Sequence, residues 1–85
     1  MASYELLIKP SAVIELEAVE PGDRGRIVDR ILRLSSLPRP AGCEKLSGLE
    51  RYRVRQGQYR VLYQIDDRAR SVLVVKIGHL RDVYR

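Results

Sequence analysis

The sequence of 85 residues contains a single cysteine and a single histidine. Two such residues cannot supply the ligands of a structural zinc site, and a lone thiol cannot form an internal disulfide. We therefore predict a fold that needs no metal, cofactor or disulfide. Cys43 is then either an incidental reduced thiol or, if its pKa is depressed, a reactive one.

Long apolar runs are also missing. No segment approaches the ~18–20 consecutive apolar residues that span a membrane. The N-terminus has no basic region ahead of an apolar stretch, as a signal peptide would. The chain is short enough for one domain over residues 1–85. We expect a single cytoplasmic domain with no membrane partner.

Two common catalytic motifs are absent from the sequence. It has no glycine-rich phosphate loop, and its serines have no matching pair of histidine and acid that would form a nucleophilic triad.

The distribution of charge along the chain indicates the kind of partner. Residues 1–50 carry 7 Lys and Arg against 8 Asp and Glu, whereas residues 51–85 carry 9 against 3. Positive charge concentrated in one segment indicates a polyanionic partner, and nucleic acid is favoured over membrane because no basic amphipathic helix accompanies it.

The first half of the chain has helical spacing. A short apolar run is followed by two segments in which apolar residues recur every three or four positions, the first beginning at the N-cap candidate Ser11 and the second at Asp23. In the second segment one face carries Ile27, Ile31 and Leu34, with Val28 and Leu32 beside it. This pattern predicts a strand over residues 4–9, a helix over 11–19 and a helix over 23–36, with breaks at Pro10 and at Pro21-Gly22.

The second half alternates apolar and polar residues, as strands do. Gly57 lies between two such runs and is typical of a tight hairpin turn. We predict consecutive antiparallel strands over residues 51–56, 58–66 and 71–78. The whole pattern is α+β: an N-terminal strand and a helical hairpin packed on a small antiparallel sheet.

Alternation puts Arg51, Arg53 and Arg55 on one face of their strand. Arg60 joins them if the hairpin loop has two residues: it pairs with Arg53 if the loop is residues 56–57, or with Arg55 if the loop is 57–58. A loop of three residues would direct it to the other face.

Several like charges on one sheet face repel one another, so an anion is expected there. Arginine suits phosphate because its planar fork donates two directed hydrogen bonds. The alternative is that nearby carboxylates neutralise the cluster through surface ion pairs. The candidates are Glu44, Glu50, Asp66 and Asp67.

Three further candidate site residues follow the last predicted strand: His79, Arg81 and Tyr84. A histidine can transfer protons near pH 7, and a tyrosine can stack on a base. Each is commonly an ordinary packing or surface residue, but together with the arginines they resemble a site.

The segments KLSG, YRVR, GQYRVLYQI and GHLRDVY occur in this order between residues 45 and 84. In this, the sequence resembles the RelE-type toxins of the RelE/ParE superfamily of type II toxin–antitoxin systems. The predicted helical hairpin and the Pro-Arg-Pro linker are similar too. The resemblance implies a metal-independent, ribosome-dependent mRNA endonuclease that is neutralised by a tightly bound antitoxin protein. Such enzymes drive the 2′-hydroxyl onto the neighbouring phosphorus.

The resemblance also assigns roles to residues of this chain. It implies phosphate binding by Arg60 and Arg53, base stacking or proton transfer by Tyr84, and phosphate contact or proton relay by His79. RNA-binding positions are implied at Arg51, Arg55, Lys45 and Arg81.

Some departures of the sequence from the family pattern leave alternatives open. Arginines stand where some members have lysines, and arginine is a poor general base, so that role falls to Tyr84 or His79. Leu80 stands where many relatives have an arginine. The alternatives to a nuclease are a ParE-like toxin that poisons DNA gyrase and a catalytically inactive module that binds the antitoxin.

Overall fold

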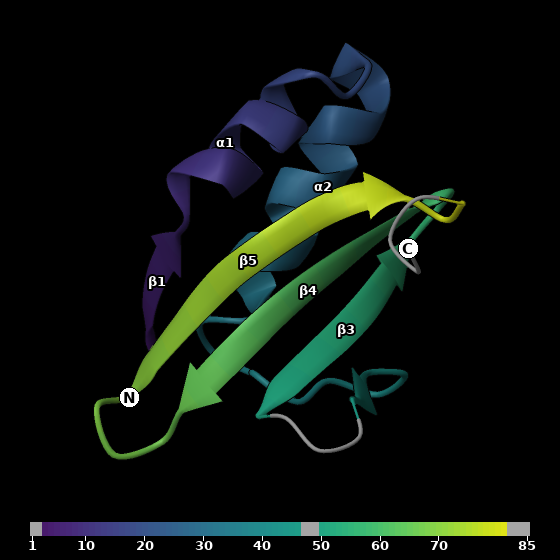
Figure 1. Cartoon of the computed structure of the whole chain (residues 1–85). Helices are drawn as coiled ribbons and strands as arrows, with labels where there is room; N and C mark the ends of the chain where they lie inside the picture. Colours follow the sequence, from purple (N-terminus) through teal and green to yellow (C-terminus); the bar gives the residue numbers. More distant parts are fainter. Residues whose placement is uncertain (1–2, 47–49, 82–85) are drawn as a thin grey trace.

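The computed structural model describes residues 3–46 and 50–81 and contains two helices and a five-stranded sheet (Figure 1). The α+β prediction is therefore confirmed. The elements are β1 (Glu5–Ile8), α1 (Pro10–Glu17), α2 (Pro21–Arg33), β2 (Glu44–Lys45), β3 (Arg51–Gln56), β4 (Tyr59–Asp66) and β5 (Ser71–His79). Neither helix is long and apolar enough to cross a bilayer.

The strands lie in the order β1-β5-β4-β3-β2. The three consecutive antiparallel strands predicted from the second half are β3, β4 and β5, and this prediction is confirmed. The N-terminal strand β1 pairs parallel to β5, so the sheet is mixed. The two-residue strand β2, which the sequence pattern did not predict, adds an antiparallel edge next to β3.

Both helices begin at a proline, where the sequence pattern predicted a break. Lys9 and Glu20 are the N-cap residues, and Pro10 and Pro21 are the first helical positions. Proline is favoured there because the first turn of a helix does not need its N–H and the fixed φ suits a helix. The predicted caps, Ser11 and Asp23, are therefore wrong, although each helix lies close to its predicted range.

One core joins the helices to one face of the sheet. In α2 the predicted stripe of Ile27, Ile31 and Leu34 is buried, while Val28 and Leu32 beside it are exposed. α2 packs over β3 and β4, and α1 packs over β5. The stripe belongs to one buried cluster with the strand residues that face the helices, which are Tyr52, Val54, Val61, Tyr63, Ile65, Val72, Val74 and Ile77. Figure 1 shows both helices on the same side of the sheet. The alternate strand positions consequently form a second face, which we call the outer face.

The turn between β3 and β4 consists of Gly57 and Gln58. Gly57 has φ of 60°, whereas Gln58 is not among the described residues with positive φ. A positive φ at the first loop position alone fits a type II′ turn. This two-residue loop fixes which residues of β3 and β4 face each other.

Replacing Gly57 and Gly25 by alanine should change stability in opposite directions. A Cβ at either position meets no atom within 4 Å, so only the backbone decides. Gly57→Ala should destabilise the fold by about 1–2 kcal/mol because L-residues are strained at this φ. Gly25→Ala, inside α2, should stabilise it by about 0.5–1 kcal/mol. Urea unfolding measures both, and a loss at Gly25 would contradict this account.

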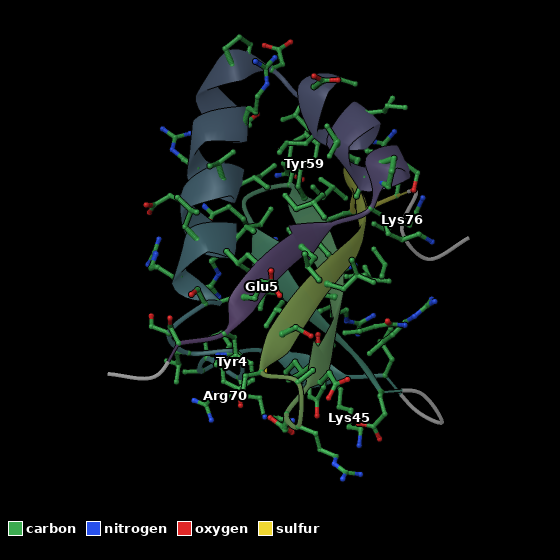
Figure 2. The ribbon with its side chains drawn as sticks, turned by 90° about the vertical axis from the view of Figure 1, so that its left-hand side faces the viewer. Tyr4, Glu5, Lys45, Tyr59, Arg70 and Lys76 are labelled. Carbon is green, nitrogen blue, oxygen red and sulfur yellow. The ribbon has the colours of Figure 1, made fainter. Side chains whose placement is uncertain are left out.

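A cluster of polar contacts ties the linker after α2 to the turn between β4 and β5. Arg39 donates hydrogen bonds to both carboxylate oxygens of Asp67 at 3.2 and 2.9 Å, and Tyr4 donates to the same carboxylate at 2.7 Å. Arg39 also donates to the Tyr52 hydroxyl at 3.2 Å. The Arg70 guanidinium lies over the Tyr4 ring (Figure 2). The hydrogen bonds from Arg39, and then that from Tyr4, lower the pKa of Asp67.

Asp67→Asn should therefore flatten the acid limb of the stability curve. A carboxyl whose pKa is lowered by folding stabilises the native state above its unfolded value of about 3.9, and this stabilisation is lost as pH falls through the folded value. The variant should be less stable than wild type at pH 7 and equal to it near pH 2. Arg39→Ala should flatten the same limb. Urea unfolding between pH 2 and 7 measures this, and parallel curves for wild type and Asp67→Asn would refute it.

Candidate functional site

The hairpin of β3 and β4 brings two arginines directly together on the outer face. Arg55 is the register partner of Arg60, as predicted for a loop of residues 57–58. The alternative loops, residues 56–57 and a three-residue loop, are wrong. Directly opposed residues have Cβ atoms roughly 4.5–5.5 Å apart. Arg53 lies on the same face two residues before Arg55, so three arginines share one patch.

Glu44 of β2 lies beside this arginine patch, which we define as Arg53, Arg55 and Arg60. It is the register partner of Arg53, and Arg53 Nε donates to Glu44 Oε1 at 2.9 Å. That hydrogen bond, then the charge of Arg53 and finally that of Arg60, lower the pKa of Glu44. Of the four carboxylates considered from the sequence, Glu44 is the one with an ion pair to the patch.

The other three carboxylates have different partners. Glu50 Oε1 lies 3.5 Å from Lys45 Nζ, and Asp67 pairs with Arg39. Asp66 accepts a hydrogen bond from the backbone N–H of Ala69 at 3.0 Å and so shapes the turn after β4. Of these four carboxylates, Glu44 is the one that pairs with the arginine patch, as the alternative interpretation expects of an acidic residue.

The arginines differ in how far they extend into solvent. Arg55 is exposed, and its Nε donates to the carbonyl of Gly57 at 3.2 Å. Arg53 and Arg60 are partly buried, with the Arg53 side chain 19% exposed. Buried Leu62, across from Arg53, lies next to them on the same face. The patch therefore combines two well-packed guanidinium groups with one exposed group.

Arg51 and Lys45, two of the predicted RNA-binding residues, have different positions. Arg51 lies two residues before Arg53, so it shares the outer face and extends the row of arginines along β3. Lys45 is the register partner of Tyr52, a residue of the core face, and its ammonium contacts Glu50. The structure does not join Lys45 to the arginine patch.

His79 does not lie with the arginines either. It is the last residue of β5 and the register partner of Tyr59, whose ring belongs to the core face. The two rings pack edge to face at 5.5 Å. The Arg60 partner in β5 is Gly78, so His79 is directed to the opposite face. The expectation that His79 and the arginines form one cluster is wrong.

Arg81 and Tyr84 complete the set of predicted residues. The exposed Arg81 donates its backbone N–H to His79 Nδ1 at 3.4 Å, while the neighbouring Leu80 N–H donates to the Gln58 carbonyl at 2.9 Å. The segment that follows β5 thus begins against the β3–β4 turn. Tyr84 lies outside the described residues.

Lys76 is a cation that the sequence analysis did not consider. Its Nζ lies 3.0 Å from Glu15 Oε2 of α1, and Glu15 Oε1 accepts the backbone N–H of Ile77 at 2.9 Å (Figure 2). β1 ends opposite Val74, so Glu15 covers the part of the β5 edge that β1 leaves open. This pair is a structural contact, and only the strand pairing reveals it.

Within residues 3–46 and 50–81, no three His, Cys, Asp or Glu side chains come close enough together to hold a metal ion. The arginines and Glu44 are described side chains of the outer face, and guanidinium groups are suited to bind an anion and to stabilise negative charge.

Comparison with known proteins identifies the relatives of this chain. A family model of the ParE toxin of type II toxin–antitoxin systems, parDE, matches residues 8–84. Toxin RelG of Mycobacterium tuberculosis is 41% identical over 34 residues, which are 40% of this chain and 39% of that protein. The chain thus aligns with well under half the length of this curated relative.

Solved structures match over much more of the chain. The RelBE2 toxin–antitoxin complex of Mycobacterium tuberculosis aligns with a TM-score of 0.82 and 26% identity over 93% of both chains. The archaeal RelE–RelB complex of Pyrococcus horikoshii OT3 aligns with a TM-score of 0.82 and 25% identity over 93% of this chain and 96% of that one. Because the family model spans nearly the whole sequence, the chain belongs to the ParE toxins of type II toxin–antitoxin systems, within the RelE/ParE superfamily.

Proposed function

We propose that this toxin is a metal-independent endonuclease that cuts mRNA on the ribosome. The observation that carries the proposal is the arginine patch, in which Arg55 and Arg60 face each other across two strands and Arg53 lies beside them. Fixed guanidinium groups are suited to hold the non-bridging oxygens of one phosphate and to stabilise the extra charge of a five-coordinate phosphorus.

In the proposed reaction, the 2′-oxygen of the nucleotide before the cut attacks the adjacent phosphorus. A 2′-O–P bond forms, the bond from phosphorus to the 5′-oxygen breaks, and the 2′-hydroxyl proton goes to a base while an acid protonates the leaving oxygen. The products are a 2′,3′-cyclic phosphate and a 5′-hydroxyl. Arg60 and Arg53 hold the phosphate in line for this attack.

The proton-transfer role goes to Tyr84 in this proposal. The sequence left Tyr84 and His79 as alternatives, and His79 packs against Tyr59 on the face opposite the arginines. An arginine remains protonated and cannot accept the proton. Tyr84 also offers a ring on which a base of the RNA stacks. Arg51, Arg55 and Arg81 supply further positive charge for the RNA backbone.

The proposed protein partner is a small antitoxin. The two similar complexes named above contain RelB-type antitoxins bound to their toxins. An acidic or amphipathic antitoxin segment would complement the arginine patch of this chain and block access of RNA to it. We expect a tight heteromeric complex that prevents cleavage.

A translation reaction reconstituted from purified components tests the proposal. The toxin is added to ribosomes translating a defined mRNA, and the ends of the fragments are analysed chemically. The proposal predicts cuts within the translated frame that leave 2′,3′-cyclic phosphate and 5′-hydroxyl ends and that depend on ribosomes. Intact mRNA, or fragments ending in a 3′-hydroxyl, would contradict it.

A second candidate function is poisoning of DNA gyrase, which the match to the ParE family model favours. An arginine patch can bind phosphate without any cleavage chemistry. Gyrase-linked DNA breaks in cells that express the toxin, together with intact mRNA, would support this function. Harmless expression without an antitoxin would instead support an inactive antitoxin-binding module, which Leu80 in place of the family's arginine also favours.

A further inference from the structure

Glu44 is hydrogen-bonded to the guanidinium that we assign to phosphate binding, and it is the more exposed of the two side chains. Its carboxylate lies 2.9 Å from Arg53 Nε, and its side chain is 60% exposed while that of Arg53 is 19% exposed. A phosphate approaching Arg53 from solvent therefore meets a negatively charged group already hydrogen-bonded to the same donor. Carboxylate and phosphate compete for arginine because both accept from its fork.

The strand that carries Glu44 is the least anchored part of the sheet. β2 has two residues, both exposed, and pairs only with Arg53 and Tyr52. The backbone hydrogen bond from Leu46 N–H to the Arg51 carbonyl at 2.8 Å lies at its end. An ion pair whose carboxylate is largely exposed and lies on such a short edge strand can be replaced when a stronger anion arrives.

We infer that Glu44 is an internal competitor of the RNA phosphate at Arg53, so that it lowers affinity for free RNA and leaves the site to RNA held in place by the ribosome. RNA bound to a ribosome reaches the arginine patch at high effective concentration and displaces the carboxylate. Free RNA lacks this advantage and is repelled. The inference rests on the proposed function, because it assigns the patch to RNA.

The contact with Glu44 also reduces the repulsion among the like charges of the arginine patch in the uncomplexed toxin. Arg55 and Arg60 are direct neighbours, and Arg53 lies beside them, which destabilises the fold by repulsion. The lowered pKa of Glu44, caused by Arg53 and more weakly by Arg60, indicates that its charge acts on more than one arginine. The Glu44 carboxylate thus stabilises the arginine patch and disfavours the binding of free RNA.

Binding of a 2′-O-methyl oligoribonucleotide to the full-length toxin tests the inference. This RNA cannot be cut by 2′-attack, so affinity is measured apart from cleavage. Glu44→Gln should tighten binding at least about fivefold, the factor expected for removing one like-charge contact at 4 Å in water. The plot of log affinity against log salt should steepen by about 0.7, since one more phosphate is neutralised. Glu44→Ala should behave in the same way.

Glu5→Gln is the matched control, because it changes the net charge equally at the opposite edge of the sheet, roughly 19 Å away at four strand spacings. It should change affinity less than twofold. The gain from Glu44→Gln should vanish in an Arg53→Ala background. A gain equal to that of Glu5→Gln, a gain that persists without Arg53, or weaker binding would overturn the inference; weaker binding would mean that Glu44 holds Arg53 in position.

The RNA-binding test of Glu44 can fail or succeed independently of the mRNA-cleavage test of the proposed function. If the toxin leaves translated mRNA intact but Glu44→Gln still gains RNA affinity through Arg53, the nuclease proposal fails and the role of Glu44 as a competitor stands. If mRNA is cut but Glu44→Gln binds RNA as Glu5→Gln does, the nuclease proposal stands and the role of Glu44 fails.

Discussion

Arg60→Ala is expected to lower the rate of mRNA cleavage by about 100-fold or more. Loss of one preorganised donor to a developing oxyanion typically costs about 10²–10³ in rate. Arg60 is suited to such a role because it lies in β4 between β3 and β5, is partly buried, and faces Arg55 across the hairpin. Single-turnover cleavage of ribosome-bound mRNA measures the effect.

Two matched variants separate the role of Arg60 from that of net charge. Arg68→Ala removes the same charge from the exposed turn between β4 and β5 and should leave the rate within about threefold of wild type. Arg60→Lys keeps the charge but loses the planar fork, and should recover only part of the activity. Equal losses in Arg60→Ala and Arg68→Ala would show that overall charge, not the patch, governs activity.

Tyr63→Ala is expected to leave little folded protein. Tyr63 is 0% exposed, and its ring is stacked on that of Tyr52 at 5.9 Å between centroids. Truncation of a large buried aromatic costs about 3–5 kcal/mol. A domain of this size has about 4–13 kcal/mol of stability in total. Thermal unfolding followed by circular dichroism measures the loss, and an unchanged midpoint would contradict this core assignment.

The hydroxyl of Tyr63 contributes separately from its ring. It donates to the carbonyl of Pro38 at 2.7 Å inside the protein, and burial is the main cause of its raised pKa. Tyr63→Phe leaves that carbonyl unpaired and should cost about 1–3 kcal/mol. Tyr59→Phe, at a partly exposed ring, should change stability by under about 0.5 kcal/mol. A cost for Tyr63→Phe as small as this would mean that water replaces the hydroxyl.

The β3–β4 hairpin and the shared face of its arginines could be predicted from neighbouring residues in the sequence. A glycine between two alternating runs permits few turns, and the loop of Gly57 and Gln58 was one of the two that direct Arg60 toward the arginines of β3. The stripe of Ile27, Ile31 and Leu34 was predictable for a similar reason, since helical spacing alone identifies the buried face.

Contacts between distant segments were harder to predict. The parallel pairing of β1 with β5 joins the first strand to the last, and the two-residue β2 has no periodicity of its own. Pro10 and Pro21, the first residues of the two helices, read as breaks in the sequence because proline ends one element as readily as it begins the next. The pairing of β1 with β5 and that of β2 with β3 can be identified only from the tertiary structure.

His79 shows how one residue at a strand end changes a site. The sequence pattern ended the last strand at Gly78 and left His79 in a loop, free to approach the arginines. The strand extends to His79, so alternation directs its side chain toward Tyr59 and the core face. Glu44 illustrates the opposite case. The sequence offered four carboxylates, and only the register of β2 with β3 distinguished the one that contacts Arg53.

The most direct test of the central claim is a map of 5′ ends across cellular mRNA after the toxin is induced without an antitoxin, in wild-type and Arg60→Ala forms. We predict new 5′-hydroxyl ends in phase with codons inside translated frames for the wild type, and none for Arg60→Ala. Growth arrest without such ends, or the same ends in both forms, would contradict an arginine patch that cleaves mRNA on the ribosome.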